Sequence, residues 1–390
     1  MSEETKKAPA IRFQGFSDAW EQRKLIEEAD FFDEKRIPID SDKRVQGRYP
    51  YYGATGVIDY VDNYIFDGEY ILLAEDGANI ITRNSPVAYI TEGKFWLNNH
   101  AHIMKMKLGS NLFLLQLLER QNYEKFNSGT AQPKLNGQIV KNMIFNFPSY
   151  KEQNKIGNFF KLIDEAIALH QRKLSLLEQL KQTYLQVMFP QGQDSIPILR
   201  FAGHSEPWEQ HKLGEISESY SGGTPSVAIQ SYYGGSIPFI RSAEINSKNT
   251  ELYLTEEGLN NSSAKLVDVG DILYALYGAT SGEVGISQIN GAINQAILAI
   301  KPKIEYDSNF IMQWLRRQKM SIISTYLQGG QGNLSGSIVK DLALYAPTKQ
   351  EEQTKIGSFF KQLDDTIALH QEKIAHLKVL KSTLLNKMFI

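Results

Sequence analysis

The stretch that decides the fold is EQNKIGNFFKLIDEAIALHQRKLSLLEQLKQTYLQVMF at residues 152–189, which returns as EQTKIGSFFKQLDDTIALHQEKIAHLKVLKSTLLNKMF at residues 352–389. The two strings align without gaps and are identical at 22 of 38 positions. So high an identity between two segments of one chain indicates an internal duplication. The chain is therefore predicted to consist of two copies of one plan.

Both copies predict a long helix with a narrow apolar stripe, because apolar residues recur in alternating steps of four and three, the spacing of a coiled-coil seam. The seam includes Ile163, Ile167, His170 and Leu174 on the first helix, and Leu363, Ile367, His370 and Ile374 on the second. Either helix alone would expose its stripe to water, so the two are predicted to pair with each other. Pseudo-twofold symmetry between the copies predicts an antiparallel pair. A metal or proton-switch role for the two seam histidines is the weaker interpretation, since a single polar seam residue usually fixes register.

A second repeat opens each copy of the plan. Arg12-Phe13 and Trp20-Glu21-Gln22 return as Arg200-Phe201 and Trp208-Glu209-Gln210. The predicted domains in chain order are a first globular domain at residues 1–150, a central helix at 151–190, a second globular domain at 191–348 and a C-terminal helix at 349–390. The fold class is mixed α+β, with two globular α/β domains separated by two long helices that pair as an antiparallel coiled coil.

The two globular domains are predicted to share their order of elements. The expected strands are Tyr70–Ala74 and Ala101–Met106 in the first domain, and Asp271–Leu276 and Ala296–Ile300 in the second. A helix is expected near residues 111–126 and near residues 309–327. Short landmarks also correspond, namely Gly77-Ala78 with Gly278-Ala279 and Asn99-His100-Ala101 with Asn294-Gln295-Ala296. The loops share almost nothing else, which suits two domains that read different ligands of one class.

Composition limits the chemistry of the chain. It has no cysteine, which excludes disulfides and zinc–thiolate sites, and seven scattered histidines make a metal site a weak hypothesis. Neither a membrane span nor a secretory signal is recognisable, so we expect a soluble, intracellular protein. The net charge is −2, so any contact with nucleic acid must be local.

Taken together, these motifs resemble the specificity subunits of type I restriction-modification systems over essentially the whole chain. The resemblance rests on the entry motif at Arg12 and Arg200, the turn Ser221-Gly222-Gly223-Thr224-Pro225 and the two repeated helices. It implies two target-recognition domains, each reading half of a bipartite asymmetric DNA site. It also implies that the helices set the spacing and dock methyltransferase subunits, two of them, while restriction subunits join through the complex. S-adenosylmethionine, ATP and magnesium would be used by those partners in the prokaryotic cytoplasm. The resemblance implies no cofactor or metal in this chain and no membrane contact.

Candidate DNA contacts are polar loop residues whose side chains suit base edges and phosphates. In the first domain they are Tyr51, Tyr52, Thr55, Arg83, Asn98, Asn99 and His100. In the second domain they are Thr224, Ser226, Arg241, Tyr277, Asn294, Gln295 and Asn333. For any one of them, a role in a turn or at the edge of the core is the simpler interpretation.

Two other classes of function stay open. One is a coiled-coil adaptor whose globular domains bind proteins, and the other is an enzyme. The sequence contains neither a Gly-x-x-x-x-Gly-Lys-Ser/Thr phosphate loop nor an Asn/Asp-Pro-Pro-Tyr/Phe methylation motif. Asp76 with Glu92-Gly93-Lys94 only loosely imitates a nuclease metal site, and the second domain has no counterpart. His100 and His102, predicted to share one face of a strand, are a weak metal hypothesis. We therefore expect a non-catalytic chain.

Overall fold

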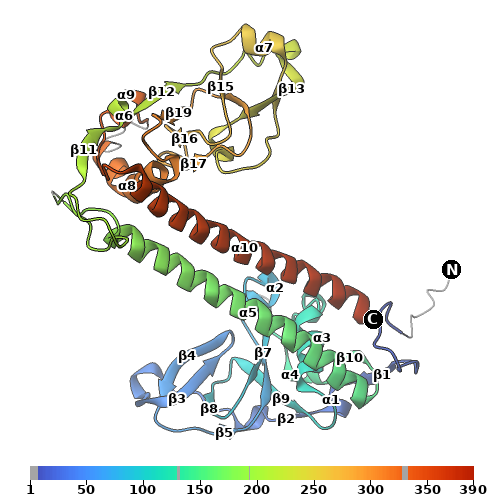
Figure 1. Ribbon diagram of the computed structural model, residues 1–390. Coiled ribbons are helices and arrows are strands. Elements are labelled where there is room, and N and C mark those ends of the chain that lie inside the picture. The colour runs from blue at the N-terminus through green and yellow to red at the C-terminus, as the bar shows by residue number, and fades with distance from the viewer. Residues whose placement is uncertain (1–7, 130–131, 193, 327–332) are drawn as a thin grey trace. The chain divides into compact units, whose positions relative to one another are not determined.

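The structure is a computed structural model (Figure 1). It describes residues 8–129, 132–192, 194–326 and 333–390. The sequence stretches Gly129-Thr130-Ala131-Gln132-Pro133 and Gly329-Gly330-Gln331-Gly332-Asn333 lie partly outside these residues.

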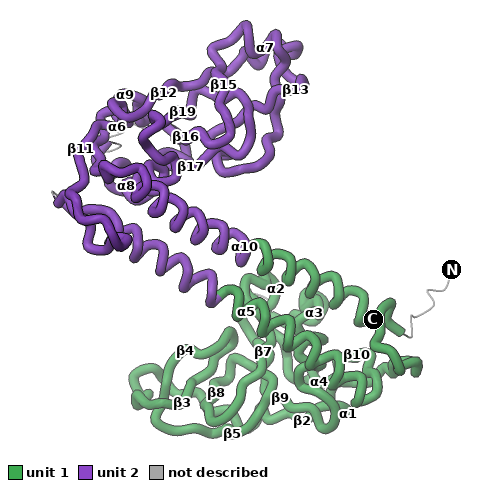
Figure 2. The backbone as a smooth tube through the Cα atoms, in the orientation of Figure 1, with its two compact units in different colours: residues 1–171, 372–390 green, residues 172–371 purple. Residues whose placement is uncertain are grey.

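The chain divides into two compact units, coloured separately in Figure 2. Unit 1 comprises residues 1–171 and 372–390, and unit 2 comprises residues 172–371. Both boundaries between the units fall inside the long helices α5 (Tyr150–Val187) and α10 (Gln350–Met388). Each unit therefore holds one globular domain together with part of α5 and part of α10.

Two four-stranded sheets and a two-stranded ribbon form the globular part of unit 1. The strands are β1 (Glu21–Lys24), β2 (Ala29–Phe31), β3 (Gln46–Gly53), β4 (Gly56–Val61), β5 (Phe66–Asp67), β6 (Tyr70–Ala74), β7 (Ala88–Thr91), β8 (Lys94–Leu97), β9 (Ala101–Met106) and β10 (Ile144–Phe147). One sheet has the order β2-β9-β6-β7 and is antiparallel throughout. The other has the order β4-β3-β8-β5, in which β3 and β8 run parallel. β1 and β10 form the ribbon.

Short helices surround these sheets. They are α1 (Leu25–Glu28), α2 (Asn79–Thr82), α3 (Asn111–Arg120), α4 (Gly137–Lys141) and the 3-10 helices η1 (Asp33–Lys35), η2 (Ser41–Lys43) and η3 (Glu124–Phe126). α3 begins at Ser110, whose side-chain oxygen accepts a hydrogen bond from the backbone N–H of Phe113 at 3.3 Å. Such a cap satisfies a donor that has no partner within the helix. The predicted strands of this domain have the bounds expected from the sequence.

Unit 2 repeats the plan. Its strands are β11 (Glu209–Lys212), β12 (Ser217–Ser221), β13 (Tyr233–Ile240), β14 (Tyr253–Leu254), β15 (Lys265–Val267), β16 (Ile272–Ala275), β17 (Val284–Ile286), β18 (Gly291–Ile293), β19 (Ile297–Pro302) and β20 (Ala343–Ala346). Its helices are α6 (Leu213–Ile216), α7 (Glu256–Asn260), α8 (Ser308–Tyr326), α9 (Gly336–Lys340), η4 (Gln230–Tyr232) and η5 (Ser242–Glu244). The sheet orders β12-β19-β16-β17 and β14-β13-β18-β15 match those of unit 1 strand for strand. The two globular domains thus share one topology.

An aromatic cluster forms the centre of the core in each unit. In unit 1, Phe113 of α3 stacks on Phe389 with ring centroids 5.2 Å apart, and Trp20 meets Phe113 edge-on at 5.7 Å. In unit 2, Phe310 of α8 stacks on Phe189 at 5.3 Å. Phe189 and Phe389 are equivalent positions of the duplicated helix segment. The core of unit 1 is therefore completed by Phe389, just after the end of α10, and the core of unit 2 by Phe189, just after the end of α5.

The helix segments inside each unit run antiparallel. In unit 1, Ile156 and Phe160 near the start of α5 lie in one cluster with Met388 at the end of α10. In unit 2, Ile356 near the start of α10 lies in one cluster with Leu185 near the end of α5. The eight predicted seam residues are all buried or half-buried. The predicted antiparallel pairing is confirmed within each unit.

Equivalent buried ion pairs tie the entry motif to the helices. Arg12 donates through Nε and Nη2 to both carboxylate oxygens of Glu152, at 2.8 and 2.6 Å. Arg200 does the same to Glu352, at 2.8 and 2.7 Å. The two glutamate side chains are only 1% and 2% exposed. The arginine of the repeated entry motif thus fixes the start of each domain to the start of a long helix; we call each of these arginine–glutamate pairs a clamp.

None of the helices in the described parts of the chain combines the length and the apolar character that a bilayer crossing requires.

Candidate nucleic-acid interface

Three segments of unit 1 meet where β6 ends. The backbone N–H of Glu75 donates to the carbonyl of His100 at 2.9 Å, and the N–H of Leu135 donates to the carbonyl of Glu75 at 2.7 Å. Asp76 forms an isolated β-bridge with Lys134. These bonds bring the residue after β6, the turn before β9 and the segment around residue 134 together. Chemically different side chains from distant parts of the sequence thereby share one surface.

Hydrogen bonds to Asn98 fix the turn before β9. The N–H of Asn98 donates to the carbonyl of Tyr52 at 3.1 Å, and the side-chain oxygen of Asn98 accepts from the N–H of His100 at 2.8 Å. Tyr52 in turn stacks on Tyr89, with ring centroids 5.8 Å apart. Burial raises the pKa of Tyr52 above its ordinary value. Asn98 and Tyr52 therefore support the surface that His100 presents.

Charged groups line this surface. Nδ1 of His100 lies 2.8 and 3.1 Å from the two carboxylate oxygens of Asp76. Lys134 lies beside the pair, with its side chain 52% exposed and its Nζ 3.5 Å from Glu75. Glu75 also accepts from Nη1 of Arg36 at 2.5 Å. Glu75 is thus neutralised from two sides, while Asp76 and His100 face outward.

A second histidine lies directly underneath and is buried. His102 is 1% exposed, with Nδ1 2.8 Å from Asp33 and Nε2 2.9 Å from the carbonyl of Leu135. Burial alone would raise the pKa of Asp33, but its hydrogen bond and attraction to His102 bring that pKa below its ordinary value. Among the described residues no group of three or more His, Asp and Glu side chains is placed to hold a metal ion. Both histidines contact carboxylates: His100 contacts Asp76 at the surface, and His102 contacts Asp33 inside the domain and lies 3.7 Å from Glu75.

Unit 2 builds the same frame from other residues. The N–H of Leu276 donates to the carbonyl of Ala296, and the N–H of Leu334 donates to the carbonyl of Leu276, both at 2.8 Å. Tyr277 forms a β-bridge with Asn333, as Asp76 does with Lys134.

This hydrogen-bond pattern corrects one expected landmark. The side-chain oxygen of Asn294 accepts from the N–H of Ala296 at 3.2 Å, which is the role of Asn98 toward His100. Asn98-Asn99-His100 is therefore equivalent to Asn294-Gln295-Ala296, so the pairing that begins at Asn99 is wrong by one residue. The pairing of Gly77 with Gly278 agrees with the frame, and both glycines have positive φ. Short motifs in unlike loops allow such a slip because their spacing is not fixed by periodicity.

The predicted contact residues of unit 1 fall into two groups. Thr55, at the tip of the β3–β4 hairpin, is exposed, as are Asn99 and His100. Tyr51 is 1% exposed, and its hydroxyl accepts from the N–H of Ile39 at 2.9 Å. Because Tyr51 and Asn98 are buried, the expectation that they present side chains to a ligand does not fit the structure. Tyr52 is half-buried in the supporting layer.

Arg83, another predicted contact, is occupied at the end of a helix. Its φ is 55°, in the left-handed region, and its guanidinium donates to the carbonyls of Glu119 and Gln121 at the end of α3. Cations are favourable at a helix C-terminus, where carbonyls lack partners within the helix. Arg83 is therefore explained by the fold.

The predicted contacts of unit 2 also divide. Thr224, Ser226, Gln295 and Asn333 are exposed, and Tyr277 and Asn294 are half-buried. The hydroxyl of Thr224 donates to the side-chain oxygen of Gln295. Thr224, Gln295, Tyr277 and Asn333 all belong to the frame that is equivalent to the Asp76 surface.

Arg241 is instead held by two carboxylates. Its Nη2 donates to Glu244 at 2.8 Å and to Glu251 at 2.6 Å. Burial would raise the pKa of Glu244, but hydrogen bonds from Arg241 and from backbone N–H groups lower it to about 2. The guanidinium is thus engaged within the domain, which accounts for this arginine without a ligand.

Sequence reasoning missed Asp76, Lys134 and Arg36 as parts of this surface. Asp76 was considered only as a metal ligand, and Lys134 follows a proline in a stretch without a periodic pattern. The signal that could have found Asp76 is its place directly after a buried strand and next to Gly77, the same place that Tyr277 occupies before Gly278. Arg36 gave no comparable signal.

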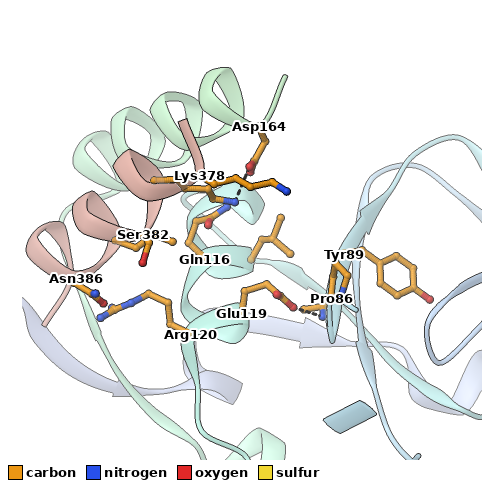
Figure 3. A pocket seen from close by; sticks show the side chains of 13 residues that line it. Pro86, Tyr89, Gln116, Glu119, Arg120, Asp164, Lys378, Ser382 and Asn386 are labelled. Atoms are coloured by element: carbon orange, nitrogen blue, oxygen red, sulfur yellow. Dashed lines mark hydrogen bonds and ion pairs between the residues drawn. The ribbon is translucent and has the colours of Figure 1, made fainter. Parts of the chain in front are cut away.

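A cavity of about 690 Å³ in unit 1 lies between α3, the residues around β7 and the helix segments (Figure 3). Its carboxylates are engaged: Asp164 accepts from Nζ of Lys381 at 2.6 Å, and Glu119 accepts from the N–H groups of Val87 and Ala88 at 2.7 and 2.6 Å. Figure 3 shows Glu119 turned toward that strand. The cavity brings together packing and capping groups and no paired nucleophile and base.

Comparison with known proteins gives the family. Residues 17–179 and 205–379 match the family described as Type I restriction modification DNA specificity domain. A putative type I restriction enzyme specificity subunit of Haemophilus influenzae is 36% identical over 151 residues, 38% of each chain. A type I restriction enzyme specificity subunit of Methanocaldococcus jannaschii is 27% identical over 191 residues, 47% of this chain and 44% of that protein. The chain thus matches about two fifths of the length of these relatives.

The fold has a close counterpart among solved structures. The type I restriction-modification S subunit from M. genitalium superposes with a TM-score of 0.74, over 98% of this chain and 99% of that one, at 15% sequence identity. An identity this low speaks for the fold alone, while the family match covers both globular domains and both helices. The chain belongs to the family described as Type I restriction modification DNA specificity domain.

Proposed function

We propose that the two globular domains each read one half of a bipartite, asymmetric DNA site. The chain then gives a type I restriction-modification complex its sequence specificity, directing methylation and restriction. The observation that carries this proposal is the shared frame with different side chains. The strand end and turn that present Asp76 and Asn99-His100 in unit 1 present Tyr277 and Gln295-Ala296 in unit 2.

The chemistry of the two surfaces supports an asymmetric site. Unit 1 presents a carboxylate, an imidazole and an ammonium group from Asp76, His100 and Lys134. Unit 2 presents hydroxyl and amide groups, including those of Thr224 and Gln295. Each base pair shows its own pattern of donors and acceptors in the major groove, so surfaces with different donors and acceptors select different bases.

We further propose that the long helices set the spacing between the half-sites and dock two methyltransferase subunits, through which restriction subunits join. Exposed apolar side chains support a docking role. In unit 1, Leu162 and Leu169 on α5 are 64% and 53% exposed and lie seven residues apart. Residues at that spacing share one face of a helix, and apolar patches on a surface mark interaction sites.

In this proposal the chain has no catalytic role of its own. S-adenosylmethionine, ATP and magnesium act in the partner subunits, since the sequence carries neither a phosphate loop nor the methylation motif. The competing hypothesis is an adaptor whose globular domains bind proteins; it shares the helices but has no use for a polar reading surface.

The deciding experiment adds the purified chain, with and without cognate methyltransferase subunits, to a randomised duplex library in the presence of S-adenosylmethionine. We expect methylation of one bipartite sequence by the complex and none by the chain alone. Turnover by the isolated chain would refute the non-catalytic role. A complex that methylates without sequence preference would favour the adaptor.

A further inference from the structure

We infer that Asp76 is a specificity-determining residue that accepts a hydrogen bond from the exocyclic amino group of a cytosine or adenine, with His100 as its positioning residue. This inference rests on the proposed DNA-reading function and deepens it. It names the chemical group on the DNA that one position of the unit 1 surface takes.

The first step is the exposure and orientation of the carboxylate. Asp76 is 24% exposed and His100 51% exposed, and Nδ1 of His100 lies within 3.1 Å of both carboxylate oxygens. A carboxylate has about four lone-pair positions, so the imidazole leaves acceptor capacity on both oxygens. The backbone of both residues is fixed, because Asp76 bridges Lys134 and the carbonyl of His100 accepts from Glu75.

The second step is the charge underneath. The neighbouring Glu75 is paired with Arg36 at 2.5 Å and lies 3.5 Å from Nζ of Lys134. Those cations are held by Glu75, whereas the carboxylate of Asp76 contacts the imidazole of His100. A carboxylate with spare acceptor capacity attracts a hydrogen-bond donor strongly and repels another hydrogen-bond acceptor.

The third step is the chemistry of base edges. The hydrogen-bond donors in the major groove are the N4 amino group of cytosine and the N6 amino group of adenine, whereas guanine and thymine present acceptors at O6, N7 and O4. Aspartate is suited to the amino group of cytosine by the same geometry. Guanine or thymine at that position would place an acceptor against the carboxylate, which excludes those bases by repulsion as well as by lost bonding.

The duplicate domain supplies the contrast. The position equivalent to Asp76 is Tyr277, and the position equivalent to His100 is Ala296, which has no polar side chain. The acceptor pair is therefore specific to unit 1. Tyr277→Phe is the matched control, since it removes a polar group at the same place in the frame of the other domain.

The test measures binding of the complete complex, the chain with its methyltransferase subunits, to duplexes that lack one amino group at a time. Purine replaces adenine and 2-pyrimidinone replaces cytosine at successive positions of the recognised site. For the unaltered protein we expect one position at which the loss of the amino group weakens binding by roughly 5-fold to 150-fold. Asp76→Ala, which removes the acceptor altogether, should weaken binding to normal DNA by a similar factor and should show no further loss at that position.

The positioning role of His100 has its own readout. His100→Ala should keep the same preferred base but reduce the penalty for removing its amino group, whereas a purely structural role would weaken binding to every duplex equally. Tyr277→Phe should leave the penalty at the Asp76 position unchanged. Thermal unfolding checks that each variant is folded. The amino-group scan on the unaltered protein needs no variant at all.

Two outcomes overturn the inference. One is an unaltered complex that tolerates the loss of every single amino group in both half-sites. The other is a folded Asp76→Ala variant that shows the unaltered penalty at every position. Failure of the proposed function looks different, because the unaltered complex would then bind no sequence selectively, and no position could be assigned.

Discussion

Glu152 and Glu352 are nearly inaccessible carboxylates, each held by two guanidinium nitrogens of one arginine. The hydrogen bond from Arg12 to Glu152 raises the pKa of Arg12 above its ordinary value, which keeps the guanidinium charged. A bidentate geometry is specific to arginine, since lysine offers only a point charge. The fold uses this pair twice because the start of each long helix must be fixed to the domain before it.

Glu152→Gln should lower the free energy of unfolding of unit 1 by about 3–5 kcal/mol, because it leaves a guanidinium buried without its countercharge. Denaturant unfolding combined with hydrogen exchange measures the loss and locates it. Glu352→Gln is the matched variant and should produce the same loss in unit 2. The double variant Arg12→Met/Glu152→Leu should recover most of the stability, since the burial cost of both charges disappears. A Glu152→Gln variant as stable as the unaltered chain would contradict the clamp.

Glu244 gives a prediction about acid. Its pKa is lowered from 4.5 to about 2, so the folded domain binds this proton more weakly than the unfolded chain does. A lowered carboxylate pKa contributes stability above the unfolded value, and that contribution is lost as the pH falls through the folded value. The stability difference between the unaltered chain and Glu244→Gln should therefore be full above pH 4.5 and shrink toward pH 2. Urea unfolding across that range measures it, and a difference independent of pH would refute the assignment.

Single residues were the hardest scale to predict from the sequence. Tyr51 and Thr55 are four residues apart in one loop-like stretch, yet one is buried and the other exposed. Their difference arises from the hairpin of β3 and β4 and from the backbone of Ile39, which the local sequence does not specify. Arg83 and Arg241 have the right chemistry for DNA. The carbonyl partners of Arg83 lie far along the chain at the end of α3, whereas Arg241 is held by Glu244, three residues away, and by Glu251.

At the scale of elements, the sequence was much more informative. The strands β6 and β9 and the start of α3 agree with the predicted residues, because β6 is an uninterrupted apolar run, β9 is mostly apolar and a capping serine marks the start of α3. The long helices were predictable because their seam repeats along almost their whole length. β3, β4 and β13 were not, since they carry glycine, proline and tyrosine in no clear alternation.

One pair of equivalent aspartates in the duplicated helices has different hydrogen-bond partners in the two units. Asp364 accepts from Lys181 at 2.5 Å, Gln313 at 2.7 Å and Arg316 at 2.7 Å, all within unit 2. Its equivalent in unit 1 is Asp164, which accepts from Lys381 at 2.6 Å. Burial lowers the pKa of Lys181, and Asp364 opposes that effect.

Asp364→Asn should therefore destabilise unit 2 by about 1–3 kcal/mol, because it leaves two half-buried cations without a carboxylate. Asp164→Asn should cost unit 1 less than about 1 kcal/mol, as expected for one partly exposed pair. Hydrogen exchange along α8 and α10 would locate the larger effect in unit 2. Equal losses from the two substitutions would show that the extra donors to Asp364 add nothing.

At the scale of the molecule, duplication and antiparallel pairing together require that each core use a residue from a distant part of the chain. Phe389 completes the unit 1 cluster around Phe113, while Phe189 completes the unit 2 cluster around Phe310. The sequence predicted the duplication and the pairing but not this exchange of aromatic rings. The placement of these two rings is a consequence of the antiparallel direction of the helices, because the end of one helix must lie beside the start of the other.

Because the reading surface of each unit is built within that unit, we expect each globular domain to read its half-site independently of the other. The backbone bonds that hold Asp76 and His100 come from unit 1, and those that hold Tyr277 and Ala296 come from unit 2. Replacing residues 198–347 with the equivalent domain of a related subunit should therefore change one half of the recognised sequence and leave the other half intact. Mapping of methylated sites in cells carrying the exchanged chain measures this. A change in both half-sites would refute modular reading.

The last prediction uses the helices as the spacer of the proposed function. The division into units falls after Gln171 in α5 and after Gln371 in α10, two equivalent positions. One seven-residue heptad inserted after each would preserve the seam and leave the contacts within each unit intact. Each helix would gain about 10.5 Å at 1.5 Å per residue.

On DNA, that length corresponds to roughly 3 bp at 3.4 Å per step. We expect the unspecific gap to lengthen by about that amount, while both half-site sequences stay the same, because the reading surfaces are untouched. Methylated-site mapping gives the gap directly. The matched control inserts the heptad after Gln171 alone, which shifts one helix against the other and should destabilise the pair. An unchanged gap in a double-insertion variant that assembles and methylates would mean that the spacing is set by the partner subunits, and that the helices serve only to hold the two readers in one chain.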